Sequence, residues 1–460
     1  MALGKRKNQD QMSWVASCDL PRSPGHPFYD KLNRLLAEAE FDRFVEKLCG
    51  PYYAEALGAP SIPPGVYFRM LFIGYFEGID SQRGIAWRVA DSLSLRSFLG
   101  IPATKPTPDH SSLTRIRQRL AGEVHEAVFR KVLGMAHERG LLVGKTAAVD
   151  ATLLEANAAM KSIVRKDTGE DYRAYLKRLA EEAGLSDPTD EEVKRFDKHR
   201  PGKKMSNREW ESKTDPDSRI MKMKDKRTHL SYKAEHVVDL DTEMLLAVEV
   251  YHGDQGDTET LVESLEAASE NLKAVDDELE IQEVPADSGY HSLETLVDCQ
   301  GRRLRTYIAE PRGSKGRVWR EKPKGQREAF QANHRRCKGK RAKKLQRLRR
   351  EKVERSFAHL CETGGARRSW LRGVGKVFKR YVIQGVAHNL GVMMRALFGM
   401  GTPRSLQGSG VFALLRRLIE RIGRVVPHLL GHPEDAIEFS AESAPACRDD
   451  AGAVVLLTVA

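Results

Sequence analysis

The sequence lacks several patterns that assign proteins to well-known classes. Its six cysteines are scattered over 460 residues without a CxxC pair, which argues against zinc and disulfide frameworks and favours a reducing compartment. No stretch approaches about 18 consecutive apolar residues, so no membrane span is predicted. The basic start MALGKRKNQD has no apolar run behind it and does not predict a signal peptide. We therefore expect a cytoplasmic protein.

What the sequence has in excess is positive charge. The formal net charge is +12, and 19 lysines and arginines face only four acidic residues between positions 311 and 355. A concentrated basic block contacts phosphate or another anionic surface more often than a uniform excess does. The composition, 40% hydrophobic and 30% charged, is otherwise that of a globular protein with room for roughly two to four domains. A polyanionic partner is the first prediction.

Residues 1–140 are predicted to form a helical DNA-binding domain. In FYDKLNRLLAEAEFDRFVEKLCG, leucine, phenylalanine and valine recur at helical spacing until a glycine ends the pattern. The last helix of the region, PTPDHSSLTRIRQRL, has a serine as its expected cap and carries Arg115 and Arg117. Short, partly basic helices joined by tight turns fit such a module, although a plain helical bundle has the same spacing.

Residues 141–400 are predicted to form an α/β domain. A buried strand ends at Asp150, and a polar insertion follows at about residues 155–229. Next come the hairpin LSYKAEHVVDLDTEMLLAVEVYHG, a helix, a strand that ends at Asp287, a short helix, another strand, a basic loop and a long basic helix. A hairpin beside strands that are joined by helices is typical of a mixed sheet flanked by helices. For residues 401–460 we predict one helix, followed by a tail of unknown role.

Three acidic residues could meet in this domain. Asp150 and Asp287 each end a predicted strand, so their carboxylates would converge if the strands were neighbours. Glu354 stands at the margin of an apolar stripe that includes Val353 and Phe357 on the basic helix. Crowded carboxylates repel unless cations lie between them, and ligands that are all oxygen suit Mg²⁺ or Mn²⁺. Beside a basic block they favour a metal-dependent nucleic-acid enzyme, although VPADSGYHS would also fit an ordinary turn aspartate.

Several motifs together carry a resemblance to a known family. They are PSIPPGVYFRMLFIGYFEGIDSQRGIAWRVADSLSLRSFLG and TPDHSSLTRIRQRL, AVDATLLEANAAMKSIVRKDTGEDY around Asp150, ADSGYHS at Asp287, and EKVERSFAHLCETGGARRSWLRG at Glu354. These motifs stand in the family's order over about residues 20–405. The sequence resembles the DDE transposases of bacterial insertion sequences.

The resemblance implies a ribonuclease-H-like catalytic domain behind an all-α DNA-binding domain. It implies that Asp150, Asp287 and Glu354 form the catalytic triad and bind two Mg²⁺ or Mn²⁺ ions. The implied partners are double-stranded DNA, as terminal inverted repeats and as target, and a second copy of the chain on DNA. Neither a membrane nor a small-molecule substrate is expected. Such an enzyme would cut DNA strands and join their 3′ ends to target DNA at the bacterial nucleoid.

Eight arginines are the candidate DNA contacts. Arg350 matches the arginine that the family has four residues before its glutamate, whereas the signature's tyrosine and lysine are replaced by Arg347 and Cys361. Arginines near the glutamate helix or on the N-terminal helices complete the set. It comprises Arg347, Arg350, Arg355, Arg367, Arg368, Arg372, Arg115 and Arg117. For the cluster in GGARRSWLRG, a solvated turn is the alternative.

Other residues allow two interpretations each. Trp210 and Trp319 could stack on an unpaired base or anchor local packing. His252 and Asp254 could bind DNA or line the site, but a turn before the next helix explains them too. His291 could touch substrate, although a surface histidine is the simpler expectation.

Two other functions fit the same sequence. One is a metal-dependent nuclease without strand transfer. The other is a non-catalytic DNA-binding protein derived from a transposase.

Overall fold

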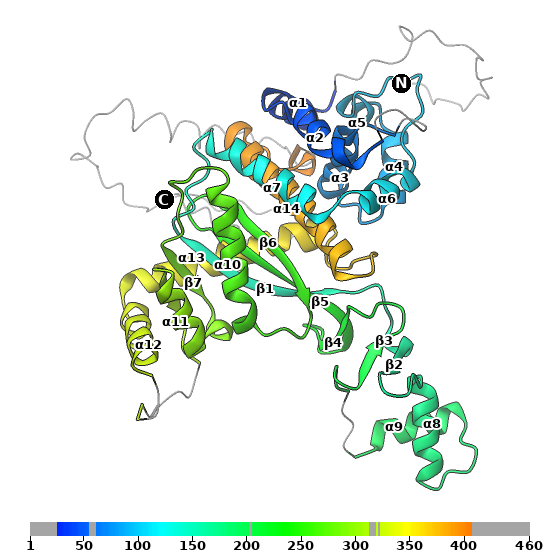
Figure 1. Ribbon diagram of the computed structural model, residues 1–460. Helices are drawn as coiled ribbons and strands as arrows, with labels where there is room; N and C mark the ends of the chain where they lie inside the picture. The colour runs from blue at the N-terminus through cyan, green and yellow to red at the C-terminus, as the bar shows by residue number, and fades with distance from the viewer. Residues whose placement is uncertain (1–24, 55–60, 202–204, 312–318, 321–322, 407–460) are drawn as a thin grey trace, which may run out of the picture. The chain divides into compact units, whose positions relative to one another are not determined.

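The centre of the computed structural model is a layer of five strands. They are β1 (Ala147–Glu155), β5 (Thr228–Asp239), β6 (Leu245–His252), β7 (Glu283–Ala286) and β8 (Arg305–Ile308). β5 pairs antiparallel with both β1 and β6, β7 pairs parallel with β8, and a parallel bridge from Thr146 to Glu283 joins the two groups. These pairings give the strand order β6-β5-β1-β7-β8, a mixed sheet, of which Figure 1 labels β6, β5, β1 and β7. The short strand β4 (Arg219–Lys222) pairs antiparallel with the start of β5. This confirms the predicted fold class.

The structure describes residues 25–54, 61–201, 205–311, 319–320 and 323–406. By their internal contacts, the described residues form one compact unit. The helix predicted beyond Gly401 lies outside the described residues.

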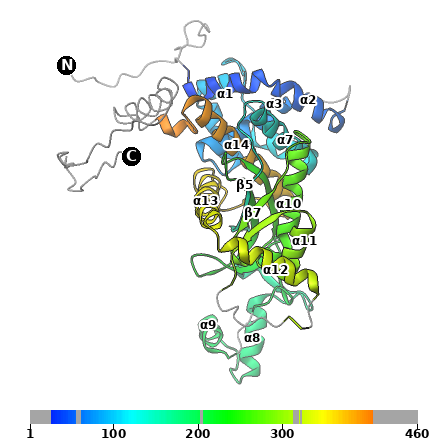
Figure 2. The same ribbon diagram turned by 90° about the vertical axis from the view of Figure 1, so that its left-hand side faces the viewer.

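Helices cover both faces of the sheet. α10 (Asp257–Lys273) contacts β5 and β6, and α13 (Lys340–Phe357) contacts β1, β5 and β7. Figure 2 shows these two helices on opposite sides of the strands. Under α13, His236 of β5 is fully buried and its ring stacks on that of Phe357. Its two ring nitrogens form hydrogen bonds of 2.7 Å with the hydroxyl groups of Ser356 and Tyr381. Burial holds the pKa of His236 well below its usual range, so the ring is neutral and anchors α13 to the sheet.

The N-terminal region is helical, as predicted. Its helices are α1 (Pro27–Glu38), α2 (Phe41–Cys49), α3 (Pro64–Glu77), α4 (Gln82–Ala90), α5 (Leu93–Phe98), α6 (His110–Arg119) and α7 (Gly122–His137). The cap of α6 is Asp109, whose carboxylate accepts a hydrogen bond from the Ser111 backbone, so the serine cap was wrong. The helix begins at His110, so the carboxylate of Asp109 satisfies an orphan N–H group of its first turn.

One long helix joins the helical region to the sheet. α14 (Val374–Phe398) contacts α3, α7 and β6, and every residue from Tyr381 to Met394 is buried. A helix that is apolar all round needs partners on every side. The helices of the N-terminal region and the sheet provide them.

The polar insertion between β1 and β5 has more structure than predicted. It contains α8 (Tyr172–Glu182), which was predicted, and the elements β2 (Ile163–Arg165), α9 (Asp190–His199), β3 (Trp210–Ser212) and β4 (Arg219–Lys222), which were not. Trp210 is buried, with its ring 5.3 Å from that of Tyr172 and 5.1 Å from that of Tyr175. Trp210 is therefore a packing anchor.

The remaining elements connect these parts. They are α11 (Leu293–Gly301), α12 (Lys324–Cys337), the 3₁₀ turns Gly50–Tyr52, Met160–Ser162, Ser288–Tyr290 and Pro403–Leu406, and a π-helical turn, Ala358–Thr363. α12 occupies part of the stretch predicted as a basic loop. In the described part of the chain, no helix is both long and apolar enough to cross a membrane.

Candidate active site

Asp150 and Asp287 come together at one edge of the sheet. Asp150 is the fourth residue of β1, and Asp287 directly follows β7, the strand beside β1. Both side chains line the same cavity, whose volume is about 740 Å³. The prediction that β1 ends at Asp150 was wrong, because the strand continues to Glu155 opposite β5. The predicted convergence of the two aspartates does not depend on that strand end.

Asp150 is held by a strong donor. Its Oδ2 lies 2.7 Å from Nη1 of Arg349, and its Oδ1 accepts a hydrogen bond from the Ala151 backbone. Burial raises the pKa of Asp150, the charge of Asp287 raises it further, and Arg349 opposes both effects. The side chain of Arg349 is 9% exposed. This buried ion pair therefore limits the cost of placing a second carboxylate near Asp287.

Asp287 also has the role of a turn aspartate. Its Oδ1 accepts a hydrogen bond from the Gly289 backbone at 2.8 Å and caps the 3₁₀ turn that follows. A Cβ on Gly289 would lie 2.5 Å from Oδ2 of Asp257, so a larger residue here would displace the Asp257 carboxylate. The turn aspartate expected for VPADSGYHS is therefore present, and the turn also fixes Asp287 at the cavity wall.

Glu354 does not lie with the two aspartates at this cavity. It is exposed on α13 and is not among the residues that line the cavity. Lys352, two positions earlier, donates to the backbone oxygen of Leu240 at the tip of the β5–β6 hairpin. Since residues two apart are about 200° apart around a helix, Glu354 projects away from that tip. Among the described residues, no three His, Cys, Asp or Glu side chains are arranged to hold a metal ion.

Other carboxylates line the cavity with the two aspartates. The full set is Asp150, Glu155, Asp225, Asp254, Asp257, Asp287 and Glu362. We call this space the acidic cavity. Glu362 lies in the π-helical turn after α13, eight residues beyond Glu354. Asp254 belongs to the YHGDQGD turn and also lies 3.5 Å from Arg219, so it lines the site and stabilises the turn.

A buried polar cluster supports the wall of the acidic cavity. The ammonium group of Lys233 lies 2.7 Å from Asp257 and 2.8 Å from the Thr260 hydroxyl. Behind it, fully buried Glu235 accepts hydrogen bonds from Ser264 and Tyr290. Burial raises the pKa of Glu235, and the Lys233 charge opposes that rise. The cluster places one fixed cation at the wall of a cavity rich in carboxylates.

Two family models match the chain. The transposase domain DUF772 matches residues 18–119, and the transposase DDE domain matches residues 185–390. The chain belongs to the DDE transposases of insertion sequences. Comparisons with curated proteins and with solved structures gave no significant match.

Membership of this family establishes the general activity of the protein. It is a DNA-processing enzyme of a family that generally depends on divalent metal ions, and DNA is its partner. The DDE match contains Asp287 and Glu354 but begins after Asp150. The evidence that Asp150 lies beside Asp287 is therefore the arrangement of the neighbouring strands β1 and β7, and not the family match.

Most candidate DNA-contact arginines of the transposase near the cavity have partners. Arg355 pairs with Glu243 and Glu351. Arg367 pairs with Glu362 and lines the acidic cavity.

The next arginines bridge chain segments. Arg368 lies 3.7 Å from Glu155 and over the ring of Trp370, and Arg372 donates to the backbone oxygen of Asn157. These arginines stabilise the segment that follows α13.

Other arginines are more open. Arg347 and Arg350 are exposed on α13, although Nε of Arg350 makes a long hydrogen bond to its own helix. Arg115 is exposed on α6, whereas Arg117 lines a separate pocket. From the sequence, Arg350 was predicted as the arginine of the site, whereas it is Arg349 that contacts Asp150. The missed signal was its spacing, because Arg349 is the charged member of the apolar stripe that continues through Val353.

The histidines and Trp319 are held by packing. Nδ1 of His252 donates a hydrogen bond to the backbone oxygen of Asp217 at 2.7 Å, and His252 is not among the cavity residues. His291 is buried edge-on to Phe330, so the expectation of a surface histidine was wrong. Trp319 also packs on Phe330, with ring centres 5.2 Å apart.

Proposed function

We propose that this transposase cuts DNA at the acidic cavity and joins the resulting 3′ ends to target DNA. The observation that carries the proposal is that Asp150 and Asp287, far apart in the chain, line one cavity at the edge of the sheet. The DNA it acts on would be the terminal inverted repeats of its own element. No serine or tyrosine nucleophile is required, because water and then a DNA 3′ hydroxyl can serve as attacking groups.

The donor set fits divalent metal ions of the Mg²⁺ or Mn²⁺ type. Asp150 and Asp287 offer carboxylate oxygens on one wall, and oxygen ligands are what these ions prefer. When bound, a pair of such ions activates the attacking oxygen and stabilises the leaving oxygen of a phosphodiester. Asp150 and Asp287 would hold them, with Glu354 as the third ligand. Arg349 would compensate the charge of Asp150 in the metal-free protein.

The exposed arginines of α13 would contact the DNA backbone. Arg347 and Arg350 have no carboxylate within ion-pairing distance among the described residues, so their charge is available to phosphate. Arg355 and Arg367 would first have to leave their partners, Glu243 and Glu362. Because two DNA ends are joined in one reaction, the active form would be a homodimer on DNA.

One observation favours a second function. In the described part of the chain, three acidic groups are not assembled into a metal site. A DNA-binding protein derived from a transposase, without catalysis, would need no such assembly. The same experiment distinguishes it from the enzyme.

The experiment uses DNA that flanks the gene, incubated with full-length protein and Mg²⁺. Asp287→Asn should bind this DNA like the wild type but lose strand cleavage. Asp298→Asn, an exposed change on α11, serves as the matched control and should keep both activities. If wild type and Asp287→Asn behave alike, the non-catalytic function is correct.

A second assay tests strand transfer. Pre-cut ends, Mg²⁺ and a target plasmid should yield joined products with the wild type. Cleavage without joined product would identify a nuclease instead.

A further inference from the structure

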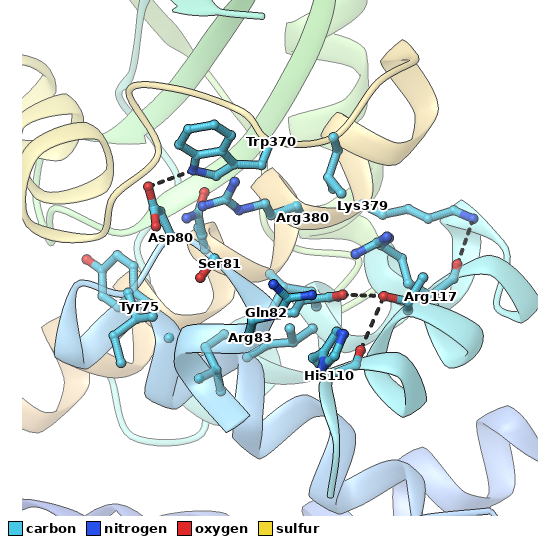
Figure 3. A pocket seen from close by; sticks show the side chains of 18 of the residues that line it. Tyr75, Asp80, Ser81, Gln82, Arg83, His110, Arg117, Trp370, Lys379 and Arg380 are labelled. Carbon is cyan, nitrogen blue, oxygen red and sulfur yellow. Dashed lines mark hydrogen bonds between the residues drawn. The ribbon is translucent and has the colours of Figure 1, made fainter. Parts of the chain in front are cut away.

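A second cavity lies where the N-terminal helices meet α14. It has a volume of about 550 Å³, and its walls come from α3, α4, α6, the segment at Trp370 and the first half of α14 (Figure 3). None of the residues that line it also lines the acidic cavity. We call it the cationic pocket.

The charges of the cationic pocket are unbalanced. Its lining contains four lysine and arginine side chains and one carboxylate, Asp80. The cations are Arg83, Arg117, Lys379 and Arg380. Asp80 accepts a hydrogen bond from Nε1 of Trp370 at 2.7 Å, drawn in Figure 3. Among the described residues, none of the four cations has a carboxylate within 4.0 Å.

Backbone oxygens satisfy only part of the hydrogen-bonding capacity of these cations. Lys379 donates to the backbone oxygen of Leu120 at 2.7 Å, and Arg380 donates to that of Gly365 at 3.1 Å. Nε of Arg117 is buried and finds no acceptor in the described part of the chain. A buried donor without an acceptor destabilises the fold, and more so when it is charged. An anion in the pocket would offset that cost.

Arg380 remains charged at neutral pH despite its surroundings. Burial lowers the pKa of Arg380 to about 10 and also lowers the pKa values of Arg117 and Lys379. Each guanidinium or ammonium group therefore repels its neighbours and attracts negative charge. The first turn of α4, with Ser81 as its cap, lines the same pocket and adds the positive end of a helix.

The cationic pocket is close to the acidic cavity along the chain. Arg367 lines the acidic cavity, and Trp370, three residues later, lines the cationic pocket. Three residues span at most about 11 Å. Arg368, between them, links the two spaces through its contacts with Glu155 and Trp370. A DNA strand at the acidic cavity would thus pass within reach of the pocket.

We propose that the cationic pocket binds a phosphate group of DNA. The inference rests on the proposed function for the choice of DNA, because a free phosphate compound offers the same chemistry. Several donors around one concave space suit a phosphate, which accepts several charge-assisted hydrogen bonds at once. Since the pocket is walled by the helical region and α14, a phosphate in it would tie DNA to both.

The test measures binding of a short DNA duplex of arbitrary sequence over a range of salt concentrations. Arg380→Gln and, separately, Arg117→Gln should weaken binding about tenfold. Each should reduce the slope of log K against log salt by about 1. The control is Arg88→Gln, since Arg88 lies on α4 outside the pocket and pairs with Glu77. It should leave affinity and slope unchanged, and unchanged values for both pocket variants would overturn the proposal.

A thermal-unfolding arm separates loss of the site from loss of the fold. Without ligand, Arg380→Gln should unfold at the wild-type temperature or above it, because the variant removes an unpaired cation. The duplex should raise the unfolding temperature of the wild type more than that of the variant. If inorganic phosphate alone shows this difference and the duplex does not, the pocket takes a small phosphate compound and the DNA assignment is wrong.

The two proposals fail in different ways. Asp287→Asn should keep the duplex affinity and the salt slope of the wild type while cleavage is lost. A cleaving enzyme whose pocket variants bind normally would contradict the phosphate site and leave the proposed function intact.

Discussion

Nη1 of Arg349 lies 2.7 Å from Oδ2 of Asp150, so an ion pair joins α13 to β1 at the acidic cavity. The two residues are 199 positions apart in the chain. Asp150 thereby has a counter-charge before any metal ion is considered, and α13 is held across the sheet. In the proposed enzyme, Arg349 would be a positioning residue for Asp150.

Removing Arg349 should destabilise the fold. In Arg349→Met, the largely buried carboxylate of Asp150 would lose its partner, at a cost of about 2–3 kcal/mol in the free energy of unfolding. Arg350→Met is the control, because Arg350 is exposed, and should change stability by less than about 0.5 kcal/mol. Urea titrations of both variants measure this difference. Equal effects would show that the ion pair contributes nothing.

A double variant isolates the pair itself. Asp150→Asn should cost less in the Arg349→Met background than in the wild type, because the buried charge is already unpaired. Additive effects would contradict a direct interaction.

Glu249 should make stability depend on pH. Burial raises the pKa of Glu249 to about 8, and Glu126, Glu263 and Glu235 add to the rise. Glu235 stands directly opposite it on β5. The unfolded carboxyl titrates near 4.5, so between pH 4.5 and pH 8 the native state binds more protons than the unfolded chain. Stability contributed by the protonated form is therefore lost as the pH rises through this window.

Replacing Glu249 by glutamine should remove this dependence. Glu249→Gln should be more stable than the wild type at pH 8 and about equal to it at pH 4. Thermal unfolding at the two pH values measures the difference. The same difference at both values would mean that Glu249 does not titrate in this window.

Two glutamates compete for the role of third ligand. Glu354 matches the family's glutamate, whereas Glu362 lines the acidic cavity and pairs with Arg367. We expect Glu354→Gln to lower the rate of DNA cleavage about 10³-fold, as removal of a key catalytic group does. Glu362→Gln should stay within about tenfold of the wild type. The reverse result would assign the third ligand to Glu362.

Much of the sheet was predictable because its patterns are local. The alternation around Tyr232 and the turn DLDTE predicted the β5–β6 hairpin, and the apolar stretch before Asp287 predicted β7. Strand neighbours in such a fold bring Asp150 and Asp287 together.

The parts that were missed depend on tertiary contacts. α12 has only Ala329 and Asn333 buried, so it carries too narrow an apolar stripe to be distinguished from a basic loop. The spacing of Arg349 within the apolar stripe of α13 indicates its burial, but no local pattern identifies Asp150 as its partner. The walls of the cationic pocket likewise come from helices as far apart in sequence as α4 and α14.

Binding of Mn²⁺ to the full-length protein tests the central claim most directly, because it needs no knowledge of the DNA ends. Electron paramagnetic resonance of free Mn²⁺ should show binding by the wild type, with duplex DNA present, and a loss of that binding in Asp150→Asn and in Asp287→Asn. The Asp298→Asn control should bind like the wild type. Mn²⁺ binding that is the same in all four proteins would contradict the assignment of Asp150 and Asp287 as the metal-holding pair.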